Sequence, residues 1–181
     1  MLYTIGTSNR SATEFYEELR KRGVKRVLDV RSKPNSRNQD FRLPNAMYVA
    51  EREGFAYAWQ GEILGGFNEI ATTKDAYRRK ADALLEMSER APLAIFCSEG
   101  HPNECHRSWK IGGYSLVQYG MITVNILRNG SEEDVTKTLL RTLSDDIPPC
   151  IREAALELSA KAEGFKLLPP KIEPVQSSLA V

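Results

Sequence analysis

Short apolar runs alternate with longer amphipathic segments along most of the chain, and this alternation constrains the fold more than any other feature. Five runs have the length and pattern of strands: residues 2–6, 27–30, 55–60, 92–97 and 121–127. Six further segments have helical patterns: residues 11–23, 45–53, 74–90, 106–120, 132–143 and 151–162. Strands separated by helices at this spacing predict an α/β fold, a three-layer domain with a largely parallel central sheet.

Local signals set several of these boundaries. Ser11 or Thr13 is a suitable N-cap for the first helix, and Gly23 is a natural stop after it. The segment GEILGGF, residues 61–67, predicts a loop because glycines punctuate it. Its LGG portion, residues 64–66, is too short to be a phosphate motif and allows two backbones to approach each other.

Length and composition predict one domain with a tail. We expect a single α/β domain at residues 1–164 and a loosely attached tail at residues 165–181, which carries three prolines and no periodicity. Three cysteines are an odd number and argue against a disulfide framework. No signal peptide or membrane-length apolar run is apparent, so we expect a cytoplasmic protein that has no membrane partner.

Charge is balanced overall but not locally. The formal net charge is +1, which indicates neither a general nucleic-acid binder nor a membrane-surface protein. Residues 10–42, however, contain ten Lys or Arg and five Asp or Glu, an excess of five positive charges. Within this stretch, SKPNSR predicts a basic loop in which Lys33 and Arg37 could contact phosphate groups.

Three of the predicted strands end in polar clusters: TSNR after the first, DVRS after the second and CSEGH after the fourth. Parallel α/β sheets bind ligands beyond the carboxyl ends of their strands. We therefore expect the three clusters to converge on one edge of the sheet and to form a site there.

The loop CSEGHPNECHRSW, residues 97–109, holds two of the three cysteines and both histidines. One hypothesis is a thiol nucleophile, either Cys97 at the strand end or Cys105 near a helix N-terminus, where the helix dipole favours a thiolate. Cysteine phosphatases also join a Cys loop to an Arg, but their spacing lets consecutive N–H groups wrap one phosphate. Nine residues separate Cys97 from Arg107 and one separates Cys105 from it, so neither spacing fits.

Two other hypotheses concern metals and anions. Cys97, His101, Cys105 and His106 are ligand types that zinc prefers, but their spacing matches no common zinc motif, and we assign no metal or other cofactor. Anion binding by arginines near a helix N-terminus needs no special spacing and is the most economical hypothesis. Each residue also has a purely structural explanation, since a free cysteine at a strand end is most often a small buried hydrophobe.

The leading prediction is therefore a cationic crevice at the strand carboxyl ends that binds a phosphorylated ligand, a nucleotide or nucleic acid, with catalysis left open. Its candidate catalytic residues are Cys97, Cys105, His106, Glu99 and Asp29. Its candidate ligand-binding residues are Arg31, Arg107, Ser8, Asn9, Ser32 and Arg37. The alternatives are a thiol-dependent enzyme that uses Cys97 or Cys105, and a non-catalytic nucleic-acid-binding module.

The ordered motifs TIGTSNR, LDVRSKPNSR, LGG and CSEGHPNECHRS resemble the family catalogued as domain of unknown function number four hundred and eighty-eight. In that family the opening motif usually has a histidine where this chain has Thr7. Residues 29–32, Pro34 and Arg37 match the strand motif and its loop. Cys97, Glu99, Pro102, Cys105, His106 and Arg107 match the last motif. The resemblance implies a compact α/β fold and carries no established reaction.

Overall fold

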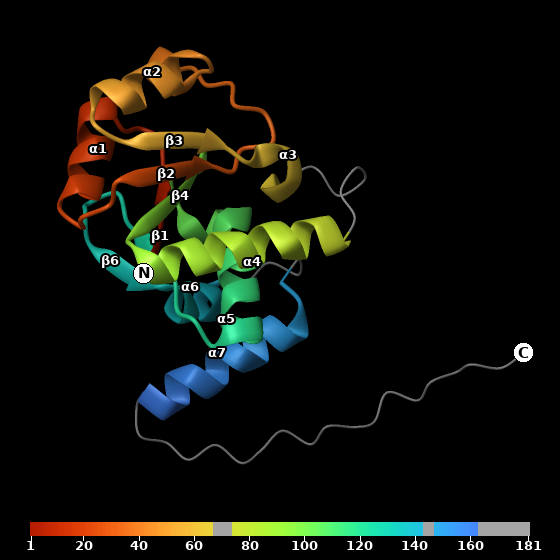
Figure 1. Ribbon diagram of the computed structural model, residues 1–181. Helices are drawn as coiled ribbons and strands as arrows, with labels where there is room; N and C mark the ends of the chain where they lie inside the picture. Colours follow the sequence, from red (N-terminus) through yellow and green to blue (C-terminus); the bar gives the residue numbers. More distant parts are fainter. Residues whose placement is uncertain (67–73, 143–146, 163–181) are drawn as a thin grey trace, which may run out of the picture.

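Six strands form one sheet in the order β3-β2-β4-β1-β5-β6 in the computed structural model, which describes residues 1–66, 74–142 and 147–162 (Figure 1). The strands are β1 Leu2–Gly6, β2 Arg26–Asp29, β3 Ala56–Trp59, β4 Leu93–Cys97, β5 Val124–Ile126 and β6 Glu132–Asp134. All neighbouring pairs are parallel except β5 with β6, which is antiparallel. The predicted α/β fold with a largely parallel sheet is confirmed.

Helices cover both faces of the sheet (Figure 1). The α-helices are α1 Ala12–Arg20, α2 Asn45–Arg52, α3 Gly61–Leu64, α4 Lys74–Arg90, α5 Gly113–Tyr119, α6 Val135–Arg141 and α7 Pro149–Ala162. Two short 3₁₀ helices, η1 Gln39–Phe41 and η2 Pro102–Glu104, and a π-helix, η3 Arg107–Gly112, complete the regular structure. None of the described helices is both long and apolar enough to cross a membrane.

Two apolar cores lie on opposite faces of the sheet. One contains Ile5, Val27 and Phe96 with side chains from α1 and α2, and the other contains Leu28 and Ile95 with side chains from α4 and η3. This division follows the alternation of side chains along a strand. A third cluster joins α5, α6 and α7 beside the sheet.

The first helix begins where its cap was expected. Ser11 accepts a hydrogen bond from the Glu14 backbone N–H, and the Glu14 carboxylate accepts one from the Ser11 backbone N–H, which makes a complete capping box. Gly23 has a φ of +68° in the turn that follows α1, a conformation that favours glycine.

Two element predictions were wrong. Residues 61–64 form the short helix α3 rather than a loop, because one helical turn is too short to show a periodicity. Residues 132–134 form strand β6 rather than the start of a helix, which begins only at Val135. The sequence of β6 is EED; an edge strand paired on one side tolerates charges that hide its strand character. The predicted tail at residues 165–181 lies outside the described residues.

Candidate functional site

The carboxyl ends of β1, β2 and β4 meet at one edge of the sheet, as expected from the sequence. The three strands are neighbours, and backbone hydrogen bonds continue past their ends. The Thr7 N–H donates to the Cys97 carbonyl over 3.0 Å, and the Val30 N–H donates to the Phe96 carbonyl over 3.0 Å. The three motif-bearing segments are therefore neighbours in space.

Four side chains from the loop that follows β4 form a compact group, which we call the Cys/His centre: Cys97, Glu99, Cys105 and His106. The Cys97 Sγ donates to Glu99 Oε2 over 2.8 Å, and the Cys105 Sγ donates to the same oxygen over 3.1 Å. His106 Nδ1 lies 3.8 Å from each sulfur. The two sulfurs and this nitrogen all lie within 4.8 Å of one another.

Strand geometry and one glycine bring the centre together. Cys97 is on the same face of β4 as Leu93 and Ile95, so its sulfur faces the core that also contains Cys105. At the end of β1, a Cβ on Gly6 would lie 2.0 Å from the Glu99 carbonyl oxygen, so only glycine lets the loop pass so close. The centre depends on this approach of loop and strand.

The His106 ring is fixed on its other side. Its Nε2 lies 3.2 Å from the Val30 carbonyl oxygen, which can only accept a hydrogen bond, so the ring proton is on Nε2. In the neutral ring, Nδ1 then carries the lone pair, and it faces the two sulfurs. Gly66 also lies against the ring, since a Cβ there would come within 2.9 Å of Nδ1.

Arg107 is buried beneath the loop, with 1% of its surface exposed. Its Nη1 donates to the Glu99 carbonyl over 2.8 Å, and its Nε donates to Thr4 Oγ1 over 3.2 Å. Thr4 is on the same face of β1 as Leu2, the face toward the Cys/His centre. The guanidinium thus contacts β1 and holds the loop backbone.

Arg31 is buried in a similar way, at 2% exposed, and pairs with Asp29. Its Nε and Nη2 donate to the two Asp29 carboxylate oxygens over 2.8 and 2.5 Å, and Nη2 also donates to the Phe41 carbonyl. The Tyr57 hydroxyl donates to Asp29 as well. Burial opposes the charge of Arg31, but the hydrogen bonds and charge of Asp29 raise its pKa above the usual value. The Arg31 Nη1 is buried without a hydrogen-bond partner.

The two thiols of the centre differ in acidity. The neighbouring Cys105 sulfur, together with burial, raises the pKa of Cys97. Burial acts in the same direction on Cys105, but the neighbouring Cys97 thiol and the positive charge of Arg107 lower its pKa well below the usual value. Cys97 and Cys105 are nevertheless only 4% and 1% exposed, so both sulfurs are nearly closed to solvent.

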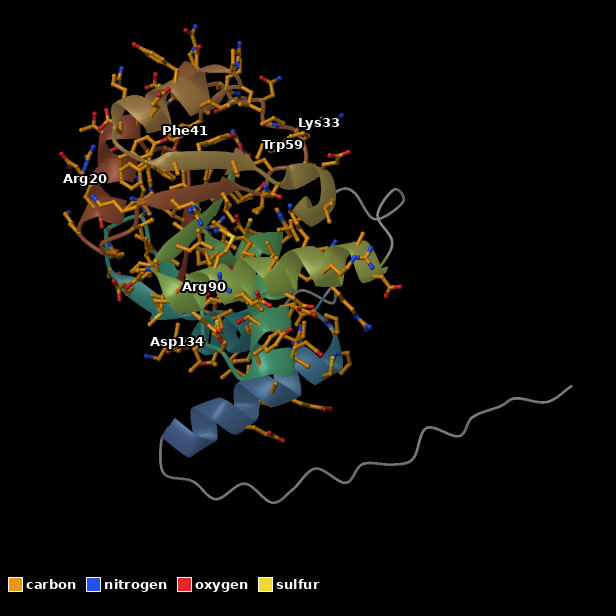
Figure 2. The ribbon with its side chains drawn as sticks, in the orientation of Figure 1. Arg20, Lys33, Phe41, Trp59, Arg90 and Asp134 are labelled. Atoms are coloured by element: carbon orange, nitrogen blue, oxygen red, sulfur yellow. The ribbon has the colours of Figure 1, made fainter. Side chains whose placement is uncertain are left out.

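The other predicted site residues lie around this edge. Ser8 and Asn9 are exposed in the turn after β1, and Asn9 has a φ of 58°. Ser32 is half-buried against Gly65, and Arg37 is exposed in the basic loop. Figure 2 shows Lys33 and Trp59 at the end of the sheet toward which β3 points, and the Trp59 ring N–H donates to the Arg31 carbonyl over 2.9 Å. His101 is exposed and is not part of the Cys/His centre.

A pocket of about 500 Å³, which the sequence analysis missed, lies among α3, α4, η3, α5 and α7. We call it the aromatic pocket. Its walls include Tyr77, Trp109 and Tyr114, and it is also lined by the cationic residues Arg78 and Lys110. Helical periodicity had assigned Tyr77 to the apolar side of its helix, which is correct but gives no sign of a cavity.

Several contacts organise the aromatic pocket. The rings of Tyr77 and Tyr114 meet edge to face with their centroids 6.3 Å apart. Lys110 Nζ lies 5.1 Å from the centre of the Trp109 ring and 3.4 Å from the Gly66 carbonyl oxygen, to which it donates. The Tyr77 hydroxyl is buried without a hydrogen-bond partner. Because Gly66 also touches His106, the pocket and the Cys/His centre are close neighbours.

No curated protein sequence matches the chain. One similar solved structure is that of a protein from Shewanella putrefaciens CN-32 named "Putative phosphatase (DUF442)". The two chains are 16% identical with a TM-score of 0.47, over 87% of this chain and 85% of the other.

A family model covers part of the chain. The match spans residues 11–76, which include the DVRS motif and LGG but neither TIGTSN nor the Cys/His loop. The resemblance drawn from the sequence motifs is thereby confirmed, because the matching family is the one described as "Domain of unknown function DUF488".

Proposed function

We propose that the chain binds a phosphorylated ligand of the nucleotide class and that the aromatic pocket receives it. The observation that carries the proposal is the combination of three aromatic side chains and two cationic ones around one cavity of about 500 Å³. Small-molecule sites in proteins are mostly apolar cavities with a few polar groups that fix the orientation of the ligand. This cavity has that composition.

The base and the phosphate would use different parts of the pocket. Tyr77, Trp109 and Tyr114 offer ring faces and edges on which a planar base can stack. The Tyr77 hydroxyl is buried beside the pocket without a partner, and a rotation of the ring that exposes it would let a base edge supply one. Lys110 and Arg78 supply positive charge for the phosphate.

This proposal moves the anion-binding role away from the arginines chosen from the sequence. Arg31 and Arg107 are 2% and 1% exposed and bind protein acceptors, so we assign them to positioning the strand ends and the loop. Ser8 and Asn9 are exposed in the turn after β1 and do not line the aromatic pocket, so the proposal gives them no binding role. The thiol-enzyme alternative needs Cys97 or Cys105 to reach a substrate, which their burial opposes.

Isothermal titration calorimetry of the full chain tests the proposal. We expect binding of AMP or GMP, weaker binding of adenosine, and no measurable binding of inorganic phosphate alone. Lys110→Met should weaken AMP binding about 10- to 100-fold, the effect of losing a hydrogen bond to a charged group. Arg37→Ala, in the exposed basic loop, is the matched control and should bind AMP like the parent.

Two results would overturn the proposal. One is the absence of any heat change with mononucleotides at millimolar concentration. The other is a chain that binds single-stranded oligonucleotides far better than AMP and loses that binding in Arg37→Ala but not in Lys110→Met. That second result would assign recognition to the basic loop at residues 32–37 and support the nucleic-acid-binding module.

A further inference from the structure

The atoms of the Cys/His centre are arranged as metal ligands are. The proposed function does not involve them, and the spacing of the motif does not match a known metal motif. Cys97 Sγ, Cys105 Sγ and His106 Nδ1 lie within 4.8 Å of one another, and Glu99 Oε2 lies 2.8 and 3.1 Å from the two sulfurs. Two thiols and an imidazole nitrogen thus converge on one point, and a carboxylate oxygen lies against both sulfurs. We propose that these four side chains bind a Zn²⁺ ion.

The distances agree with a tetrahedral site. Zn–S bonds of about 2.3 Å and Zn–N bonds of about 2.0 Å in a tetrahedron place sulfur and nitrogen about 3.5 Å apart. Both sulfur-to-Nδ1 distances in the chain are 3.8 Å. The carboxylate oxygen is closer to the sulfurs than a tetrahedron requires, as expected when it accepts their protons in hydrogen bonds. To complete the ligand set, the Glu99 carboxylate has to turn from the two sulfurs toward the His106 side of the site.

His106 donates a hydrogen bond to a backbone carbonyl, which is the kind of contact that orients a metal-binding histidine. A metal-binding histidine almost always donates its second ring N–H to a carbonyl or carboxylate, which fixes the ring and its protonation. Here Nε2 lies 3.2 Å from the Val30 carbonyl oxygen, so Nδ1 faces the two sulfurs with a free lone pair. The histidine is oriented by Val30, the residue that follows β2, and not by the loop that carries it.

Charge and burial favour an ion over a larger ligand. Two thiolates, one carboxylate and Zn²⁺ sum to one negative charge, and the buried guanidinium of Arg107, which is bonded to the Glu99 carbonyl, compensates it. Cys97 and Cys105 are 4% and 1% exposed, which admits an ion but excludes most substrates. Thiolate and imidazole ligands select zinc over magnesium or calcium.

The ligand set differs from the one considered from the sequence alone. That set contained His101, which is exposed and outside the centre, whereas Glu99 lies against both sulfurs. Four protein ligands leave no open coordination position, which is typical of a structural zinc site. The ion would join the end of β4 to the start of η3 and would act independently of any nucleotide in the aromatic pocket.

Metal analysis and Co²⁺ substitution of the full chain, purified without a histidine tag, test the proposal. We expect one zinc per chain. The Co²⁺ form should be made in the Cys150→Ser chain, so that any thiolate-to-Co²⁺ charge-transfer absorption comes from Cys97 and Cys105. We expect this charge-transfer band together with the visible absorption that is typical of tetrahedral Co²⁺. His106→Ala and Glu99→Gln should lose or weaken both signals, while His101→Ala keeps them.

The outcomes separate this proposal from the one about nucleotides. A chain that retains no zinc and shows no charge-transfer absorption with Co²⁺ would overturn the metal site and leave nucleotide binding untouched. Equal loss of the signals in His101→Ala and His106→Ala would also overturn it, because the ligand set would then be wrong. The Cys150→Ser chain carries the decisive measurement, so the result does not depend on whether a ligand variant folds.

Discussion

The Cys/His centre and the aromatic pocket are neighbours, yet they are built in opposite ways. In the centre, two buried thiols lie against the half-buried Glu99 and His106, and Glu99 alone accepts from both thiols. In the pocket, aromatic walls surround a cavity, and the buried Tyr77 hydroxyl has no partner. Polar groups that satisfy one another make a region rigid and closed, whereas unsatisfied groups beside a cavity leave it ready for a ligand.

The buried ion pair on either side of Val30, whose carbonyl contacts His106 of the centre, gives the largest expected effect. Asp29→Asn keeps the shape of the side chain but removes the charge that pairs with Arg31, whose guanidinium is 2% exposed. Leaving one partner of a buried ion pair uncompensated costs about 3–5 kcal/mol. We expect a loss of that size in the free energy of unfolding, measured by urea denaturation.

An exposed arginine provides the contrast for that measurement. Arg90 lies at the end of α4 (Figure 2), and its distance from Glu86 is 4.0 Å with both side chains mostly exposed. Arg90→Ala should change stability by less than about 0.5 kcal/mol. Similar losses for Asp29→Asn and Arg90→Ala would mean that burial does not distinguish these two arginines.

A second prediction concerns Gly6, where the loop that carries the centre passes close to the end of β1. In Gly6→Ala the new Cβ would lie 2.0 Å from the Glu99 carbonyl oxygen, so the loop has to move. We expect a loss of about 2–3 kcal/mol in stability, as for other overpacked sites, and a loss of bound zinc. Gly100→Ala, whose Cβ would be 3.4 Å from the Ser8 Cβ, is in the same loop and should retain both. If Gly6→Ala kept its zinc, the close approach would not be needed to form the centre.

The fold and the Cys/His centre could be predicted from the sequence only in part. Strand and helix periodicity gave the α/β fold, and the position of Cys97, Cys105 and His106 after one strand indicated a common site. Asp29, the main partner of Arg31, lies two residues away, and an ion pair between them could be considered from the sequence. The Thr4 contact of Arg107 could not be predicted, because it depends on the packing of distant segments. Without such a contact, a buried positioning arginine and an exposed anion-binding one look the same in a sequence.

The aromatic pocket could not be predicted for a similar reason. Its lining comes from five helical elements, and the local pattern around Tyr77 indicates only a helix with one apolar side. Strand β6 was missed because three consecutive acidic residues at a sheet edge show no apolar alternation. Features that depend on which segments become neighbours leave no signal in any single segment.

The smallest expected effect tests whether the pocket differs from the closed centre in its hydrogen bonding. Tyr77→Phe removes a buried hydroxyl without a partner, so the stability of the ligand-free chain should stay equal or rise by about 1 kcal/mol. AMP binding should weaken about tenfold, because the base loses its partner. Thermal and urea unfolding measure the first change, and calorimetry measures the second.

Tyr114→Phe is the matched variant, since Tyr114 lines the same pocket but its hydroxyl donates to Asp82 Oδ1 over 2.7 Å. It should lose about 1 kcal/mol of stability, so the two tyrosines are expected to respond with opposite signs. If Tyr77→Phe lost as much stability as Tyr114→Phe, the hydroxyl of Tyr77 would be satisfied within the protein. Tyr77 would then have a hydrogen-bond partner in the protein, as the polar groups of the centre do. There would be no reason to expect a ligand that forms a hydrogen bond with Tyr77.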